Sequence, residues 1–591
     1  MKQKLHIIIL LFVYGSFFAQ EQKSSASKVL LPDEYPEERL FLHVNEDLLF
    51  VGESLNYSLY CIEPKAKRTS QISKIAYVEL ISEQGNRVFS HKLRLEKGRA
   101  YGDFFINTDV SSGNYKLIAY TRWTRNCGEP CLFQFDLTII NPYTSDQSDL
   151  RYASHNPEER PDTLYASEKQ TGISDGSLQN YGYNGLTLDI SKKEYGPREK
   201  VLLNIKMDSN TLTESLVSIS VRKIDSIGLI DKDIHPSPGK IREKNRKDLL
   251  PRYLPELRGE LISGIVLDKD SKPVENLSVA LSIPGKNYQL QIANSKKDGS
   301  FYFNIDRPYS AAKGYVQILS DRPYSYKVSM MQPKKIDVSK LEFKKFKLSK
   351  NMENLILERS VHNQLENTFL SLKPDSLMPL LGELPFYRED AITYNLGDYT
   401  MFNTIRETFV EIITHAWIAK DQKGRTVFRV RGVPPYFESP FPALVIFNGV
   451  LIQNHEDIMD YDARKISKLH LGRKRYIIGG KVFHGFIDIE TFDRDFDGYP
   501  VDGLAKQIDL RPPLPRKKYF NQAYSGSLSN KFKRIPDFRY QLLWLPDVVI
   551  SDTDNEFGFY TSDLEGDFEI TVKGFTSLGE PLFIRKAIKV E

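Results

Sequence analysis

Apolar and polar residues alternate in short runs along most of the chain, and alternation with a period of two is the pattern of half-buried β-strands. Residues rich in Gly, Asn and Ser separate the runs and indicate turns. About seven strands within about 100 residues are typical of a β-sandwich, so we expect one in the first part of the chain. The clearest runs there are 75–80, 88–93, 115–120 and 133–137.

The same alternation returns further along the chain and predicts more β units. Residues 186–224 and 261–303 show it, and a last β unit runs from 537 to 591. Residues 336–390 have a more helical composition, most clearly over 351–370. We therefore expect a mainly β, multidomain protein whose modules are joined by linkers and connectors.

Residues 391–492 combine helical and β patterns, and we predict a small α+β unit there. Thr404 and Glu407 have the spacing of a capping box, in which the Glu carboxylate bonds the N–H of the cap residue. Strand-like runs follow, and Asn448-Gly449 is the signal of a tight hairpin turn. Apolar residues after the cap fall on one helical face, namely Ile405, Phe409, Ile412 and Ile413.

The N-terminus has the parts of a secretory signal peptide. Lys2 and Lys4 supply positive charge, residues 7–18 are mostly apolar, and the small Ala19 precedes a polar stretch. No Cys follows the apolar run, so a lipid anchor is not expected, and no other run approaches the roughly 18 residues of a membrane helix. We expect residues 1–19 to be removed, leaving a protein without a transmembrane segment in the periplasm or associated with the outer membrane.

Composition narrows the class of partner. The chain has 591 residues and 40% hydrophobic residues, enough for several cores at ~100–200 residues per domain. Its 81 basic and 77 acidic residues nearly balance, which gives no reason to expect nucleic acid as a partner. Three Cys are too few for a disulfide framework; Cys127 and Cys131 are close enough to pair, and Cys61 would be left over.

The segments FLHV, VGESL, YVEL, GRAYGDF and SGNYKL follow one another within residues 41–117. In this order they resemble the bacterial macroglobulin-type β-sandwich, the module that repeats in α-macroglobulins. Residues 186–225 look like a second, degenerate copy, with YGPRE at 195–199 in place of the Gly-Glu turn. The terminal unit, with LLWLP at 542–546 and GDF at 566–568, again looks macroglobulin-like.

A different module lies between these copies. GIVLD at 264–268, PV at 273–274 and DGSFYF at 298–303 resemble the carboxypeptidase regulatory-like, or transthyretin-type, β-sandwich. The resemblance implies a β-sandwich and carries no chemistry of its own.

The α+β unit carries a third resemblance. VRG at 430–432, PALVIFNGV at 442–450, KISKL at 465–469 and GFIDIET at 485–491 match, in this order, the plug domain of TonB-dependent outer-membrane receptors. Such a receptor needs a 22-stranded barrel after its plug. The 100 residues that follow Thr491 are too few for those strands at ~9–11 residues each. We therefore expect a plug-like domain without its barrel.

The whole order of modules resembles a group of Bacteroidetes-type envelope proteins of undefined biochemistry, and the Phe18-Ala19-Gln20 ending of the signal peptide suits that origin. The predicted organisation is a signal peptide (1–19), a macroglobulin-like β-sandwich (36–143), a linker (144–183), a second macroglobulin-like unit with an insertion (184–256), a carboxypeptidase regulatory-like sandwich (257–335), a connector (336–390), the plug-like α+β domain (391–495), a linker (496–535) and a C-terminal macroglobulin-like unit (536–591).

Two short motifs approach known nucleophile chemistry and fail. Residues 126–130, NCGEP, resemble the thioester motif of α-macroglobulins, but Pro130 stands where the acylating Gln is required. Residues 172–176 match Gly-x-Ser-x-Gly, but they lie in a polar linker, whereas a nucleophile elbow needs a strand before it and a helix after it. We expect an ordinary turn in the first case and a loop in the second.

Metal sites and ligand cages are not predicted either. Residues 493–498 have the Asp spacing that opens a calcium loop, but Leu504 stands at the twelfth position, where a Glu is needed. The ten His are scattered, without the His-Glu-x-x-His motif of zinc hydrolases. The three Trp are expected to pack in cores or domain interfaces: Trp123, Trp417 and Trp544.

These observations predict a protein that is not an enzyme and has no cofactor, metal or catalytic residues. The leading hypothesis is a periplasmic or outer-membrane-associated binding or scaffold protein whose plug-like domain engages an envelope protein, such as a β-barrel, by docking inside or beneath the barrel or by strand addition at a sheet edge. The alternative is a macroglobulin-type protease trap that lacks a thioester, with residues 226–256 as its bait segment. A third hypothesis, a cryptic hydrolase, requires an acid, a base and a nucleophile to meet in the fold.

Overall fold

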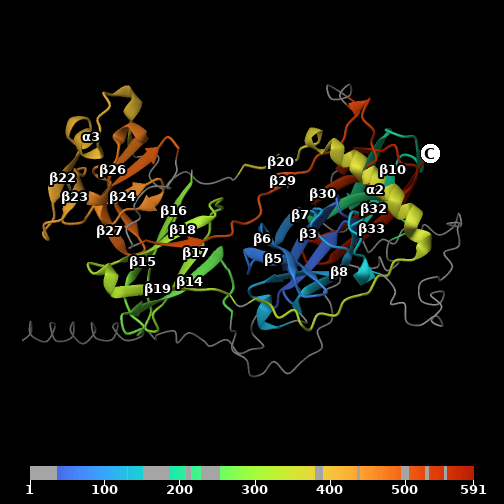
Figure 1. The fold of residues 1–591 in the computed structure, drawn as a ribbon, viewed down its shortest axis with the longest axis horizontal. Coiled ribbons are helices and arrows are strands. Elements are labelled where there is room, and N and C mark those ends of the chain that lie inside the picture. The colour runs from blue at the N-terminus through green and yellow to red at the C-terminus, as the bar shows by residue number, and fades with distance from the viewer. Residues whose placement is uncertain are drawn as a thin grey trace, which may run out of the picture.

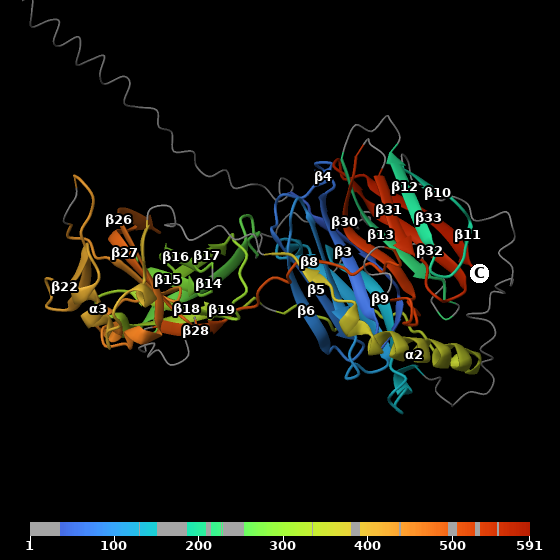
Figure 2. The same ribbon diagram turned by 90° about the horizontal axis from the view of Figure 1, so that it is seen from above.

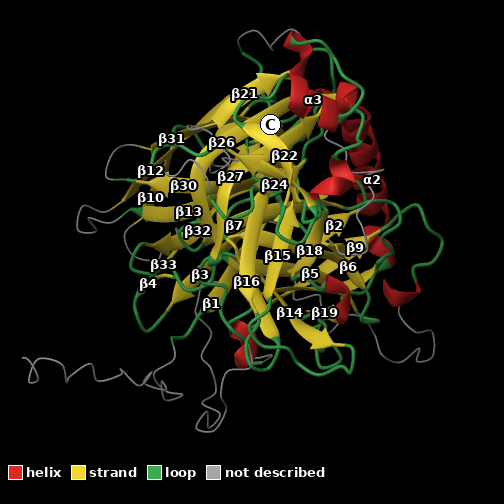
Figure 3. Ribbon diagram, turned by 90° about the vertical axis from the view of Figure 1, so that its left-hand side faces the viewer, coloured by secondary structure: helices red, strands yellow, loops and turns green. Residues whose placement is uncertain are grey.

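The protein consists of two lobes joined side by side, as the computed structural model shows in two views (Figures 1 and 2). Lobe I contains the N-terminal and C-terminal β-strands, and lobe II contains the strands from the middle of the chain. Strands dominate and helices are few (Figure 3), which confirms the predicted mainly β, multidomain fold. The structure describes residues 36–128, 131–150, 186–207, 214–225, 227, 253–285, 287–333, 335–379, 391–435, 439–493, 505–525, 532–551 and 555–591.

The first sandwich of lobe I packs two sheets face to face. One has the order β1-β3-β4, with β7 also paired to β3, and the other has the order β2-β9-β8-β5-β6. Their inner faces bury Leu55, Leu59, Val78 and Leu117 completely. The four strand-like runs of this region are confirmed as β5, β6, β8 and β9. The bounds are β1 (Arg39–Val44), β2 (Leu48–Phe50), β3 (Ser54–Glu63), β4 (Arg68–Thr69), β5 (Ile75–Ser82), β6 (Arg87–Arg94), β7 (Arg99–Phe105), β8 (Gly113–Thr121) and β9 (Phe133–Ile140).

The second sandwich of lobe I is built from two segments that are far apart in the chain. Its sheets have the orders β10-β12-β31 and β11-β33-β32-β13-β30, so β13 lies between two C-terminal strands. The expectation of separate units at 184–256 and 536–591 is therefore wrong. Neither segment has enough strands to cover its own apolar face. The bounds are β10 (Leu186–Ile190), β11 (Glu194–Tyr195), β12 (Lys200–Met207), β13 (Ser215–Lys223), β30 (Gln541–Ile550), β31 (Asn555–Tyr560), β32 (Gly566–Thr576) and β33 (Pro581–Val590).

The first part of the predicted connector 336–390, through α2 (Glu353–Thr368), covers lobe I. Its beginning, which we call the strap (residues 336–348), crosses the outer face of β5 and β8, where Leu341 packs on Ile81 and Ile118. Helix α2 follows and lies along lobe I, as predicted from its composition (Figure 1). The described start of the predicted linker 144–183 also packs, because Leu150 is fully buried beneath the strap.

Lobe II begins with a sandwich of two sheets, β17-β14-β19 and β16-β15-β18-β28. Strand β28 comes from the segment 496–535, so the prediction that this segment is only a linker is wrong. Strand β29, from the same segment, pairs with β20. The bounds are β14 (Glu260–Asp268), β15 (Ser278–Ile283), β16 (Gln289–Asn294), β17 (Ser300–Ile305), β18 (Lys313–Leu319), β19 (Tyr326–Met331), β20 (Ser376–Leu377), β28 (Ala505–Asp509) and β29 (Lys517–Lys518).

The second unit of lobe II is the predicted α+β unit. Its sheet has the order β21-β26-β27-β24-β25, and a separate pair, β22-β23, stands beside it. The capping box of Thr404 and Glu407 is present at the start of α3, and Asn448-Gly449 forms the turn between β24 and β25, with positive φ at both residues. The bounds are β21 (Ala391–Asn395), α3 (Ile405–Glu411), β22 (Ala416–Lys420), β23 (Thr426–Val430), β24 (Leu444–Phe447), β25 (Val450–Leu451), β26 (Ile466–Ile478) and β27 (Lys481–Thr491).

The two units of lobe II share an apolar interface. Leu444, Ile446 and Phe486 from the α+β sheet pack against Tyr288 and Ile292 of the sandwich. The other face of the same sheet is covered by the unit's own core, which includes α3. Both faces of the sheet are therefore buried within lobe II. The described residues also form short 3₁₀-helices at Thr124–Asn126, Ser148–Leu150, Pro323–Ser325, Lys350–Met352, Leu370–Leu372, Leu396–Asp398, His455–Ile458 and Ala463–Lys465.

Candidate partner-binding surface

The structure places the thioester-like motif in a turn of the first sandwich. Cys127 and Cys131 form a disulfide, a pairing that the sequence left open. Cys127 therefore has no thiol that could be acylated. Cys61 is fully buried in the core of the same sandwich, and this burial raises the pKa of its thiol. Neither the motif nor the remaining thiol offers a reactive group at the surface.

Several other predicted features lie wholly or mostly outside the described residues. These are the signal peptide 1–19, the Gly-x-Ser-x-Gly match at 172–176, most of the segment 226–256 and most of the acidic turn 493–498. Among the residues that are described, no group of three or more His, Cys, Asp or Glu side chains is placed to hold a metal ion. No helix of the described part is long and apolar enough to cross a membrane.

One histidine and one serine do meet, across the interface between the two sandwiches of lobe I. The Nδ1 atom of His43 lies 2.6 Å from Oγ of Ser218, although the residues are 175 positions apart. Both side chains are buried, at 2% and 0% exposure, and Tyr60 also donates to Ser218. Burial lowers the pKa of His43 well below its ordinary value, and the nearby charge of Lys573 lowers it further. This pair holds two domains together and is closed to a substrate.

A cluster of buried charges in lobe I is also satisfied internally. Arg359 of α2 donates to both carboxylate oxygens of Glu53, at 2.9 and 2.7 Å, and to Asp225 at 2.5 Å. Arg222 of the second sandwich bonds Glu46 and Glu53 of the first. The charges of Arg359 and Arg222 lower the pKa of Glu53 in spite of its burial. The cluster joins α2 to both sandwiches, and its groups are occupied by one another.

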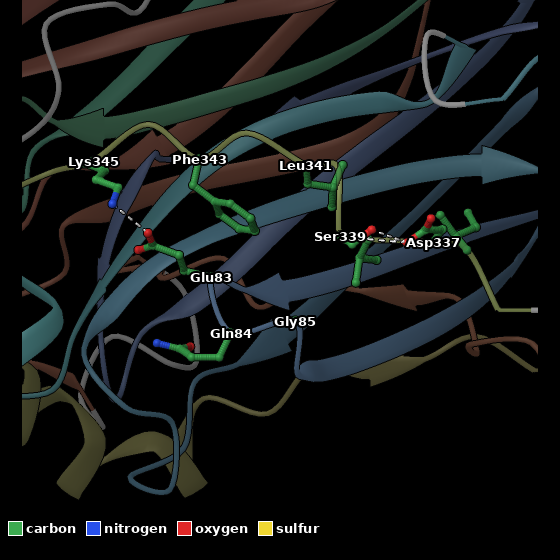
Figure 4. Close-up of a pocket in the computed structure, with 10 residues that line it drawn as sticks. Glu83, Gln84, Gly85, Asp337, Ser339, Leu341, Phe343 and Lys345 are labelled. Carbon is green, nitrogen blue, oxygen red and sulfur yellow. Dashed lines mark hydrogen bonds and ion pairs between the residues drawn. The ribbon is translucent and has the colours of Figure 1, made fainter.

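A hollow of about 570 Å³ opens between the strap and the turn after β5 (Figure 4). Phe343 and Leu341 point into it from the strap, and Glu83 faces Lys345 across it, in an ion pair of 3.0 Å. Asp337 accepts a hydrogen bond from Ser339 of the strap. The hollow is wide and open, and its polar groups are paired rather than converging on a common point, since Gln84 donates a hydrogen bond to Asp149.

Exposed aromatic and cationic side chains gather elsewhere, on the hairpin of β22 and β23. Alternation sends Ala416 and Phe428 into the core of the α+β unit. The opposite face of the hairpin carries Trp417, which is 37% exposed, directly across from Arg429. We define the hairpin face as the side chains of His415, Trp417, Ala419, Val427, Arg429 and Arg431.

The expectation that Trp417 packs in a core or interface is wrong, whereas Trp544 does pack at the interface of the two sandwiches, 5.3 Å from the ring of His43. The register explains the difference. Trp417 falls on the outward phase of β22, while its neighbours Ala416 and Ile418 fill the inward phase. Sequence reasoning missed this surface because the phase of a short strand is decided by which face is covered.

Three arginines concentrate positive charge at the hairpin face. Arg429 donates to the backbone oxygens of Ser439 and Phe441, and Arg473 of β26 donates to those of Arg431 and Gly432. Within the described residues, no carboxylate forms an ion pair with Arg429, Arg431 or Arg473. Partial burial and the charges of Arg473 and Arg431 lower the pKa of His415.

The hairpin is held in place from two sides. Asp321, from the loop after β18, forms ion pairs with Lys423 and Arg425 in the turn of the hairpin. On the other side, His455 accepts a hydrogen bond of 3.0 Å from the N–H of Phe428. The hairpin lies at the end of lobe II that is farthest from lobe I (Figure 1). The face is thus cationic, with Trp417 and Arg431 exposed, and the hairpin that carries it is held on both sides.

Comparison with known proteins gives a limited result. The sequence matches no model of a protein family, and no curated protein matches it. Similar solved structures include bacterial α2-macroglobulins. Among these are the Escherichia coli protein activated by porcine elastase (8% identity, 94% of this chain and 44% of that chain, TM-score 0.23), the native E. coli protein (10%, 95% and 40%, TM-score 0.23) and the Salmonella protein reacted with methylamine (10%, 94% and 39%, TM-score 0.23). The chain spans less than half the length of these structures.

Proposed function

We propose that this protein is a non-catalytic binding or scaffold protein of the bacterial envelope, in which lobe I is a structural body and lobe II recognises a protein partner. The observation that carries the proposal is the hairpin face, where Trp417, Arg429 and Arg431 are presented together at the far end of lobe II. Trp and Arg are the residue types that most often dominate binding energy at protein interfaces. The titratable clusters described in lobe I are buried and paired within the protein.

The packing of lobe II bears on how the plug-like unit would bind. Its five-stranded sheet is covered on one face by the neighbouring sandwich, through Tyr288 and Ile292, and on the other by its own core. Insertion into a partner's barrel would require that sandwich to separate from the sheet. Recognition through the hairpin needs no such rearrangement and leaves the apolar interface intact. Of the two modes expected for an envelope partner, this supports surface recognition.

Site-specific photo-crosslinking in intact cells tests the proposal. A photoreactive residue replaces Val427 on the hairpin face in one variant and the exposed Leu578 of lobe I in a matched control. We expect an adduct with an envelope protein from position 427 and none of the same mass from position 578. Adducts that form only from position 578, or no adduct at all, would contradict a recognition role for lobe II.

A further inference from the structure

We propose that the hairpin face binds an extended, acidic segment of a partner protein, which adds as a third strand along the free edge of β22. This inference rests on the proposed function and deepens it by naming the chemistry of the partner. Three observations carry it: the hydrogen-bond phase of the hairpin, the charge on its exposed face and the aromatic side chains beside that charge.

The hydrogen-bond phase leaves the outer edge of β22 open. The N–H of Arg431 donates to the oxygen of His415, and the N–H of Asp421 donates to that of Arg425, so the odd-numbered residues of β22 bond β23. In an antiparallel pair the intervening residues point their backbone groups away from the partner strand. Ile418 and Lys420 therefore direct their N–H and C=O groups outward. In the described part of the chain, β22 and β23 form a sheet of two strands that no other strand joins.

Strand addition at that edge would place the side chains of the new strand next to the hairpin face. Successive side chains of a strand alternate between faces, so every second residue of the partner segment would stand beside Trp417 and within reach of Arg429. The guanidinium group matches the carboxylate in a planar, two-pronged geometry. Arg429 and Arg431 have no carboxylate partner among the described residues, so acidic side chains on this face of the segment complete the surface.

The geometry favours a protein segment over a membrane surface. A lipid headgroup would use the arginines and the aromatic side chains, but it would leave the outward N–H groups of Ile418 and Lys420 without a matched ladder. An extended backbone satisfies those groups and the charges at once. Phe441, which is 39% exposed and is held by the hydrogen bond from Arg429, adds apolar area at the same place.

The test uses the full mature chain and a fluorescein-labelled ten-residue peptide of alternating Glu and Thr, followed by fluorescence anisotropy. We expect saturable binding that weakens with ionic strength. A peptide with Lys in place of Glu should not bind, and a peptide N-methylated at alternate residues should bind at least about tenfold more weakly, because it cannot complete the ladder. In a separate measurement, binding of the protein to anionic phosphatidylglycerol vesicles is tested.

Two matched pairs of variants locate the site. Lys420→Pro and Lys420→Ala both lose the Lys side chain, but only the proline loses an outward N–H, and prolines are tolerated at such edge positions. We expect Lys420→Pro to weaken binding about tenfold relative to Lys420→Ala. Arg431→Gln should weaken it by a similar factor, whereas Lys468→Gln, which removes one exposed charge from β26, should not.

Several results would overturn the inference. The inference fails if neither Lys420→Pro nor Arg431→Gln changes peptide binding. It also fails if the acidic peptide does not bind, or if the protein binds the vesicles but not the peptide. Circular dichroism of each variant confirms that the strands remain. An adduct from position 427 without peptide binding would reject only the acidic strand, whereas peptide binding without any adduct in cells would reject the proposed envelope partner.

Discussion

The units within each lobe are joined in different ways. In lobe I, an apolar cluster lies between the two sandwiches, and a buried network of directional charges, in which Arg359 and Arg222 both bond Glu53, joins them to α2. In lobe II, the sandwich and the α+β unit meet through apolar side chains such as Phe486 and Tyr288. Lobe I assembles segments from distant parts of the chain, and directional bonds form only when every segment is correctly placed. The apolar contact of lobe II tolerates small shifts and needs no such register.

The replacement Arg359→Ala should have the largest effect, because it leaves Glu53 and Asp225 buried with less compensation. Removing one partner of a buried ion pair costs about 3–5 kcal/mol. We expect the loss of stability to be confined to lobe I. Amide hydrogen exchange should become faster in β13 and α2 and stay unchanged in β24. The exposed neighbour Glu358→Gln is the control and should change exchange very little. Equally faster hydrogen exchange in both lobes would contradict the proposed difference between their interfaces.

Phe486→Ala tests the apolar interface in the same way. The side chain is fully buried between the two units of lobe II, and truncating a buried Phe costs about 3–5 kcal/mol. Exchange should accelerate in β15 and β24 while β13 stays protected. Phe492→Ala removes an exposed ring from the same unit and serves as the matched control. Unchanged exchange in β15 would show that the interface contributes little to stability.

Glu256 stands at the joint between the lobes and should make it sensitive to pH. Its carboxylate accepts from Tyr77 and from the N–H of Leu261, with Arg122, Lys92 and Glu260 close by, and burial raises its pKa from 4.5 to about 7. The folded state therefore holds a proton that the unfolded state releases between these two values. The contribution of neutral Glu256 to the free energy of unfolding is fully present below pH 4.5 and is lost as the pH rises through 7, by an amount on the order of 3 kcal/mol.

Glu256→Gln keeps a neutral group at that position and should flatten the profile. We expect the free energy of unfolding of the variant to change less between pH 5 and pH 7 than that of the parent, in urea titrations at each pH. The exposed Glu275→Gln is the control and should retain the parental slope. Parallel profiles for parent and Glu256→Gln would remove Glu256 as the cause.

The smallest effect is expected for Lys345→Ala at the hollow of Figure 4. Its ion pair with Glu83 joins side chains that are 63% and 31% exposed. Exposed pairs contribute about 0–1 kcal/mol, and added salt screens them. Thermal unfolding of the variant should nearly coincide with that of the parent, and a large loss would mean that the charged contacts of lobe I are strong even where water reaches them.

Local order was predictable where the pattern and the turn chemistry agree. The alternation of 75–80 and 115–120 became β5 and β8, because a strand sends every second side chain to the same face; one face packs in the sandwich core and the strap covers the other. The capping box at Thr404 and the Asn448-Gly449 turn also formed, because both depend on residues within a few positions. The helical composition of 351–370 became α2 for the same reason.

Long-range pairing was not predictable in this way. Nothing local in β13 indicates that it pairs with strands more than 300 positions away, and β28 reads as part of a linker until β18 is placed beside it. Hydrophobic contact has no direction, so an apolar face specifies that it must be covered but not by which segment. The outward position of Trp417 depended on the same choice.

By itself, the sequence determined the β character of the chain, its turns and caps, and the Pro130 that stands where a thioester motif has its Gln, because each of these depends on neighbouring residues. The tertiary structure alone decided that two distant segments form one sandwich, that Arg359 of α2 joins it to the first sandwich, and that Trp417 and Arg429 lie on the same face of the hairpin. These outcomes depend on which surfaces meet, and that is settled only when distant segments compete to cover the same apolar area.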